Sequence, residues 1–179
     1  MKGLLYEALR KGVLDSGCSK TVSGELWYAE FISMLSTEEQ KKVIEKPSSA
    51  VFRFGDGIES KSVMLATIPV MIGSKVFAMD VDIVEQAIPL LISKGAMKQM
   101  GMALDFQRDV AVVSGQEINI VCTETGHYCM PVSVFTSDST RFVLHVNDVI
   151  CNTDEEKNGR LSKFTVNLHM HDTTNLKSY

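Results

Sequence analysis

One carboxylate has the clearest potential for chemistry in this 179-residue chain. Asp15 follows the aliphatic pair Val13-Leu14 and precedes Ser16 and Gly17. A carboxylate at the end of an apolar run is costly to bury alone, so it needs hydrogen-bond partners or a task that uses its position. Ser16 can bond to nearby backbone, and Gly17 lets the chain bend sharply. We therefore expect Asp15 to lie in a tight loop.

Asp-Ser-Gly in such a loop resembles the catalytic loop of aspartic proteases, whose reaction needs a second carboxylate. Two carboxyl groups about 3 Å apart cannot both ionise, so they share one proton; one then activates water while the other polarises a carbonyl group. The sequence contains Asp-Ser-Gly only once. A homodimer would supply the second copy across a two-fold axis. Because water is the nucleophile in this chemistry, we expect no cofactor and no metal ion.

Other reactive residues have simpler interpretations. Asp15 itself could be an ordinary turn aspartate that bonds the backbone two residues on. Asp56 suits a hairpin turn, and Asp105 lacks a following hydroxyl and glycine. His127 has no nucleophile with an orienting partner beside it, so we expect a surface histidine. Cys18 has no neighbouring base and is interpreted as a small buried thiol.

The composition excludes several classes of protein. Hydrophobic residues make up 45% and charged residues 22%, which is typical of a folded domain. The net charge of -4 and the absence of a basic run argue against a nucleic-acid partner. No apolar stretch reaches the roughly 20 residues of a membrane span. The four scattered cysteines and the absence of an opening secretory segment predict an intracellular, cytoplasmic protein.

Strands and two short helices are predicted ahead of residue 50. Short apolar pieces at 3–9 and 12–14 predict two strands, the second of which leads into the loop. Helical spacing over 24–45 predicts two short helices, with Ser36 at the start of the second and Pro47 after its end. Trp27 and Phe31 are four residues apart on the first helix and are expected to face the core.

From residue 50 the pattern is mainly that of β-strands. A glycine-flanked turn at 55–57 and a second turn at 73–74 predict two successive hairpins. Ser93 is expected to cap a helix that Gly101 ends, and the methionines around it, Met97, Met100 and Met102, to fill the core. The predicted strands are 50–54, 61–70, 76–84, 88–93, 102–106, 110–113, 117–122 and 128–132.

Three of these segments, in order, resemble a retropepsin-type aspartic protease from the Pol polyprotein of an animal long-terminal-repeat retrotransposon. Residues 12–22 resemble the catalytic loop, 52–57 the flap, and 88–100 the late strand and helix. The resemblance covers roughly residues 4–132. It implies a mainly β acid-protease barrel with two or three short helices, active as a homodimer.

The resemblance also implies a site and a reaction. The reaction would be aspartic endoproteolysis of extended segments of a retroelement polyprotein. The catalytic residues would be Asp15, Ser16 and Gly17, and the substrate-binding flap would comprise Arg53, Phe54, Gly55, Asp56 and Gly57.

The chain departs from the family at two places. Ile92 stands where these proteases commonly have glycine, so we expect altered packing beneath the catalytic loop. Only 14 residues precede Asp15, so the terminal strands that form the dimer are expected to be abbreviated or rearranged. These departures motivate an alternative: a catalytically inactive retroelement relic that acts as a dimerising or peptide-binding module.

Two regions are expected along the chain. Residues 1–135 would form the protease domain, and 136–179 a polar linker followed by the degenerate start of an integrase-type zinc module. Residues 164–171 resemble that module, but no paired cysteines follow His169 and His171 to complete a tetrahedral site. We therefore expect no metal there.

Overall fold

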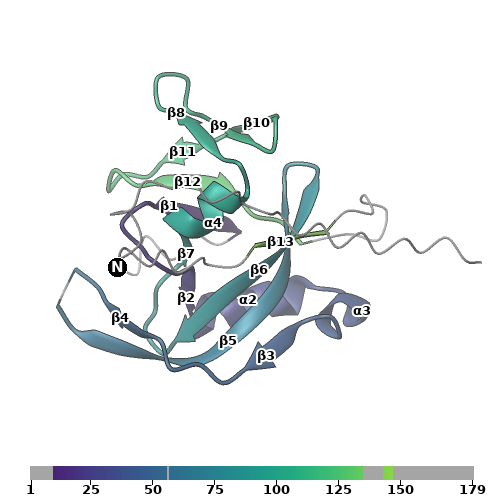
Figure 1. Cartoon of the computed structure of the whole chain (residues 1–179), viewed down its shortest axis with the longest axis vertical. Helices are drawn as coiled ribbons and strands as arrows, with labels where there is room; N and C mark the ends of the chain where they lie inside the picture. Colours follow the sequence, from purple (N-terminus) through teal and green to yellow (C-terminus); the bar gives the residue numbers. More distant parts are fainter. Residues whose placement is uncertain (1–9, 56, 135–142, 147–179) are drawn as a thin grey trace, which may run out of the picture.

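The computed structural model describes residues 10–55, 57–134 and 143–146. These residues form a mainly β structure with three helices, which confirms the mainly β part of the predicted fold class (Figure 1). None of the helices in the described part of the chain is long and apolar enough to cross a membrane.

The described part of the chain contains many short strands and few helices. The three helices are α2 (Glu25–Met34), α3 (Thr37–Gln40) and α4 (Lys94–Gln99). The strands are β1 (Lys11–Asp15), β2 (Val22–Gly24), β3 (Ile44–Lys46), β4 (Val51–Arg53), β5 (Glu59–Ile72), β6 (Lys75–Val84), β7 (Leu90–Ser93), β8 (Ala103–Asp105), β9 (Val110–Val113), β10 (Gln116–Asn119), β11 (Val121–Cys122), β12 (Tyr128–Pro131) and β13 (Val143–Val146).

Two sheets contain these strands. The larger is ten-stranded and follows the open order β11-β12-β1-β7-β2-β6-β5-β3, with β4 paired to β5 and β13 paired to β6. The smaller sheet is the meander β8-β9-β10, which lies at the opposite end of the molecule from the β4–β5 hairpin (Figure 1). The main sheet thus includes four residues beyond position 135, in β13.

Strand β7 separates two strands that are close in sequence. It pairs in parallel with β1, so that Asp15 lies opposite Ser93, and antiparallel with β2, where Leu91 lies opposite Val22. The chain therefore leaves β1, crosses the end of β7 and returns as β2. This crossing fixes the position of the loop that begins at Asp15.

The main core lies between helix α2 and the long strands β5 and β6. Trp27 and Phe31 stack with ring centroids 5.1 Å apart, and each is 1% exposed, as their spacing predicts. Met97 and Met100 of the α4 region are also buried in this core, and Met102 packs at its margin. The side chains of α2 therefore anchor the helix through two adjacent turns of one face.

Two element predictions were wrong in detail. The second predicted helix ends at Gln40, and residues 44–46 form β3, because the chain there pairs with β5 from Ile44 opposite Thr67 onward. The strand predicted over 117–122 divides into β10 and β11 at Ile120, whose backbone N–H donates to Asp109 O at 2.9 Å. The predicted strand at 3–9, and His169 and His171, lie outside the described residues.

Candidate functional site

Asp15 ends β1 and begins a tight loop, as predicted. Its Oδ1 accepts a hydrogen bond from Gly17 N–H at 2.9 Å, and its backbone carbonyl accepts one from Cys18 N–H at 3.2 Å. Asp15 is half-buried, whereas Ser16 and Gly17 are exposed. Within the described part of the chain, no group donates a hydrogen bond to the second carboxylate oxygen of Asp15. That oxygen is therefore available to a water molecule or a second carboxyl group.

Two buried hydroxyl groups hold the other end of this loop. Thr21 Oγ1 donates to Ser93 Oγ at 3.2 Å and accepts from Ser93 N–H at the same distance. Ser93 Oγ also accepts from Ala96 N–H at 3.0 Å, which makes Ser93 the N-cap of α4, as predicted. Lys94 N–H then donates to Cys18 O at 3.3 Å. The start of α4 is thus bonded to the loop at Thr21 and at Cys18. These bonds fix the position of the loop relative to the helix.

Gly12 makes room for Ile92 beneath the loop. A Cβ at Gly12 would lie 2.4 Å from Ile92 Cδ1 and 2.8 Å from Ile92 Cγ1, closer than real atoms approach. Ile92 is fully buried. The bulk of Ile92 beneath the loop therefore fits because Gly12, on the strand that carries Asp15, has no side chain. Gly12 was not predicted to matter, although a glycine within a strand often marks such a close approach.

The predicted flap is the hairpin formed by β4 and the first residues of β5. Val51 lies opposite Lys61 and Arg53 opposite Glu59, and Gly57 N–H donates to Phe54 O at 2.9 Å across the turn. Gly57 has a positive φ of 77°, which suits glycine. Gly55 is exposed, and Asp56 lies outside the described residues. The Arg53 side chain pairs with Glu59 on the exposed face.

The hairpin and the loop meet in a small apolar cluster, here called the flap-base cluster. The rings of Phe52, in β4, and Phe54, just after it, stack with centroids 6.1 Å apart. The buried members of the cluster are Val22, Phe52, Val84 and Ile88, and its partly buried margin is formed by Cys18, Ala50, Phe54 and Leu91. The structure therefore brings together two predicted segments, the catalytic loop and the flap, through side chains of which only Phe54 was predicted as a site residue. Cys18 is half-buried there, with Sγ donating to Lys20 O at 2.8 Å.

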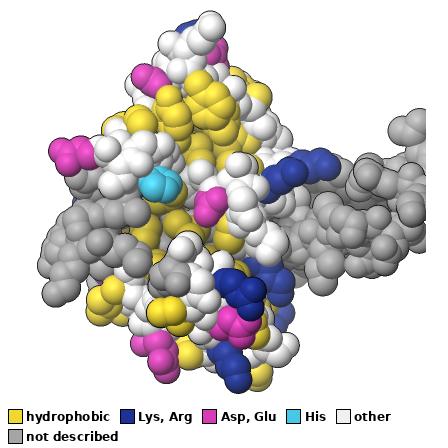
Figure 2. All heavy atoms as spheres, turned by 90° about the vertical axis from the view of Figure 1, so that its left-hand side faces the viewer, with side chains coloured by type: hydrophobic (Ala, Val, Ile, Leu, Met, Phe, Trp, Pro, Cys, Tyr) yellow, Lys and Arg dark blue, Asp and Glu magenta, His cyan; other side chains and the backbone are white. Residues whose placement is uncertain are grey.

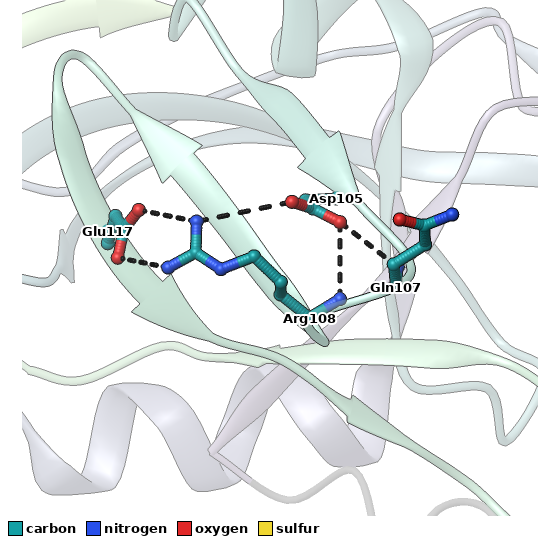
Figure 3. Close-up of polar contacts among 4 residues, drawn as sticks. All are labelled: Asp105, Gln107, Arg108 and Glu117. Atoms are coloured by element: carbon teal, nitrogen blue, oxygen red, sulfur yellow. Dashed lines mark hydrogen bonds and ion pairs between the residues drawn. The ribbon is translucent and has the colours of Figure 1, made fainter.

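The remaining candidate groups have structural roles. Asp105 Oδ1 accepts from Gln107 N–H at 3.0 Å and Arg108 N–H at 3.1 Å, which closes a turn (Figure 3). The Arg108 guanidinium then bonds both oxygens of Glu117, at 2.9 and 3.0 Å. His127 is exposed, with Nδ1 3.0 Å from Thr125 Oγ1. Both residues behave as their simpler interpretations predict.

One face of the molecule carries an exposed apolar area. Figure 2 shows hydrophobic side chains gathered on the upper part of the face that points left in Figure 1, the end that contains β8, β11 and β12. Phe106 is 57% exposed and Val121 49% exposed at that end. The Phe106 ring lies 5.0 Å from that of the partly buried Tyr128. Large exposed apolar groups of this kind are suited to contact with another protein surface.

The described residues contain no cluster of three or more His, Cys, Asp or Glu side chains that could hold a metal ion. Comparison of the chain with protein-family models, with curated proteins and with solved structures found no match.

Proposed function

We propose that this chain is a retropepsin-type aspartic endopeptidase that works as a homodimer, with one Asp15 from each copy at a two-fold axis. The observation that carries the proposal is the Asp15-Ser16-Gly17 loop, which ends a strand parallel to β7 and is bonded to the start of α4. In this proposal the ten-stranded sheet, with β7 between β1 and β2, is the acid-protease barrel of that family.

The reaction would use the open side of the Asp15 carboxylate. A water molecule between the two carboxyl groups loses a proton to the ionised one while its oxygen attacks the carbonyl carbon of the peptide. The protonated carboxyl group donates a hydrogen bond to the carbonyl oxygen. The carboxyl group that took the proton from water then transfers it to the amide nitrogen; the C–N bond breaks, the amine and the new carboxyl group leave, and the ionised carboxylate is restored. Gly17 N–H, 2.9 Å from Asp15 Oδ1, would hold the carboxylate in a fixed orientation throughout.

Two other sequestered aspartates in the described part of the chain have hydrogen-bond partners of their own, which favours a second copy as the source of the second carboxylate. Asp80 accepts a hydrogen bond from Thr67, and Asp82 accepts one from Ser48. Each of these carboxylates is thus held by a hydroxyl group on a neighbouring segment. Asp15 is the aspartate whose loop carries the hydroxyl and glycine of the family pattern.

The substrate would be an extended polypeptide, in nature the polyprotein of a retroelement. The β4–β5 hairpin would close over it, since a two-stranded hairpin can pair through its backbone with an extended chain. The partly buried margin of the flap-base cluster, which includes Phe54 and Leu91, would provide apolar contacts for substrate side chains. Exposed glycines at 55 and 57 leave the tip open to close approach of the peptide backbone.

The proposal is tested by comparing the full chain with its Asp15→Asn variant in peptide cleavage. We expect the native chain to cut peptides and to be blocked by pepstatin-like inhibitors, and the variant to lose activity by at least about 10³-fold, because the paired carboxyl groups carry the reaction. Undiminished cleavage by Asp15→Asn would overturn the assignment. A folded, dimeric native chain that binds peptides and cuts none would instead support an inactive relic serving as a dimerising or peptide-binding module.

A further inference from the structure

Asp82 is a buried acidic residue that the proposed reaction does not use. It is 3% exposed and lies on β6, flanked by Val22 of β2 on one side and Leu65 of β5 on the other. A carboxylate in such a position is costly to the fold unless it is well bonded. Among the described residues, no Lys, Arg or His forms an ion pair with it. An apolar side chain at this position would avoid the desolvation penalty of a carboxylate. We therefore expect Asp82 to have a function other than filling the core.

The side chain of Asp82 is bonded to the base of the flap. Ser48, in the segment between β3 and β4, donates its hydroxyl hydrogen to Asp82 Oδ1. The same Ser48 oxygen accepts a hydrogen bond from Ala50 N–H at 3.2 Å. Ala50 O in turn accepts from Ser62 N–H at 2.8 Å, across the hairpin. The Asp82 carboxylate is therefore connected, through the Ser48 hydroxyl and Ala50, to both strands of the hairpin.

The backbone of Asp82 is bonded to the catalytic loop. Its N–H donates to Thr21 O at 2.9 Å, at the point where the loop enters β2. Thr21 is the residue whose hydroxyl is bonded to Ser93 at the start of α4. A continuous series of hydrogen bonds thus runs from the flap base through Asp82 to the structure that holds the Asp15 loop.

We propose that Asp82, acting through Ser48, is a positioning residue that fixes the base of the β4–β5 hairpin relative to the Asp15 loop. Its effect on catalysis rests on the proposed function, but its effect on the hairpin does not. Loss of the Ser48 hydroxyl would loosen the hairpin while leaving the catalytic loop bonded to α4.

A matched pair on the same strand provides the control. Thr67 donates its hydroxyl hydrogen to Asp80 Oδ1, which is the same chemistry two residues earlier on β6. Thr67 and Asp80 lie directly opposite each other within the β5–β6 ladder, so their bond links two strands that are already paired. Removal of the Thr67 hydroxyl should therefore leave the flap unchanged.

Hydrogen exchange of the full chain tests the structural half of the proposal. In Ser48→Ala we expect the Ser62 amide to exchange about tenfold faster, as befits loss of a hydrogen bond to a charged group, with the β9 amides unchanged. Thr67→Ala should leave Ser62 at the native rate. Native exchange at Ser62 in Ser48→Ala would overturn the proposal, and so would equal acceleration in Thr67→Ala.

Two substitutions of Asp82 separate positioning from simple stability. Asp82→Asn keeps an oxygen acceptor for Ser48, so we expect native exchange at Ser62 and a native KM. Asp82→Leu removes the acceptor and adds bulk, so we expect a lower melting temperature, faster exchange at Ser62 with the β9 amides unchanged, and a KM raised about tenfold with little change in kcat. A residue that only supported the fold would not split these properties in this way.

The outcomes distinguish the two proposals. If the native chain cleaves no peptide, the proposed function fails, while the exchange rates still decide the role of Asp82. If the native chain cleaves and Asp82→Leu retains both native exchange and native KM, the positioning role fails and the protease assignment stands.

Discussion

Gly12 and Ile92 compete for the same space, so a large side chain at one position requires a small one at the other. They lie on the parallel strands β1 and β7, directly beneath the Asp15 loop. Ile92 fills the space that any side chain on Gly12 would need, since a Cβ there would lie 2.4 Å from Ile92 Cδ1. The large residue on β7 is thus matched by the small one on β1.

A double-mutant cycle tests this dependence. Gly12→Ala should lower the free energy of unfolding by about 1–3 kcal/mol, because overpacking forces neighbouring atoms apart. In an Ile92→Ala background the same substitution should cost much less, since the clashing atoms are gone. Chemical denaturation of the four proteins measures the coupling.

Gly55→Ala serves as the control for the cycle. A Cβ at Gly55 would meet no atom within 4 Å, so the substitution should change stability by less than about 0.5 kcal/mol. Additive costs for Gly12→Ala and Ile92→Ala would show that the two residues do not share this space.

At the scale of helices and strands, the starts of helices could be predicted from nearby residues, whereas some strands form only by pairing with residues far away in the sequence. Ser36 and Ser93 were identified as helix starts from sequence, because a capping hydroxyl acts within three residues of itself, and both bonds are present. Strand β3 was not predicted, since residues 44–46 become a strand only by pairing with β5, more than 18 residues away. The approach of Gly12 to Ile92 is non-local in the same way.

Strand β3 is also joined to helix α2 by a phenol group. Tyr28 donates its hydroxyl hydrogen to Glu45 Oε1 at 2.6 Å. Burial, followed by this hydrogen bond and the nearby negative charge, raises the pKa of Tyr28 well above its ordinary value of 10.0. The unfolded chain therefore loses the Tyr28 proton at a lower pH than the folded chain does. The resulting stability is fully present below about pH 9 and is lost progressively as the pH rises through 10.

Alkaline unfolding measures this effect. The native chain should lose stability between about pH 9 and 11, and Tyr28→Phe should remove part of that loss, because no proton remains to be released at this position. Tyr128→Phe is the comparison, since Tyr128 also donates to a carboxylate, that of Asp109, but through an exposed hydrogen bond. That hydrogen bond raises the pKa of Tyr128 as well, and because water screens it we expect Tyr128→Phe to remove less of the loss than Tyr28→Phe does. Identical pH dependence in the native chain and Tyr28→Phe would contradict the assignment.

At the scale of the whole molecule, the candidate site has one carboxylate where the chemistry needs two. Asp15 keeps one oxygen without a hydrogen-bond donor among the described residues, and exposed apolar residues lie at the end of the molecule that carries β8, β11 and β12. The homodimer that we propose would supply the second carboxylate and could cover this apolar area. The pairing of β1 with β7 could not be predicted from local sequence. The single Asp-Ser-Gly is visible in the sequence and is the reason why we propose a second copy.

A subunit-mixing experiment follows from this requirement. If each dimer needs Asp15 from both copies, Asp15→Asn chains will capture native chains in inactive mixed dimers. Random association of equal amounts leaves about one quarter of the dimers fully native, and a large excess of Asp15→Asn should bring cleavage towards zero at a fixed native concentration. Thr67→Ala chains, which keep Asp15, should raise cleavage when added instead. Activity that is insensitive to excess Asp15→Asn would mean that one chain suffices, and the second carboxylate would then have to come from within the same copy.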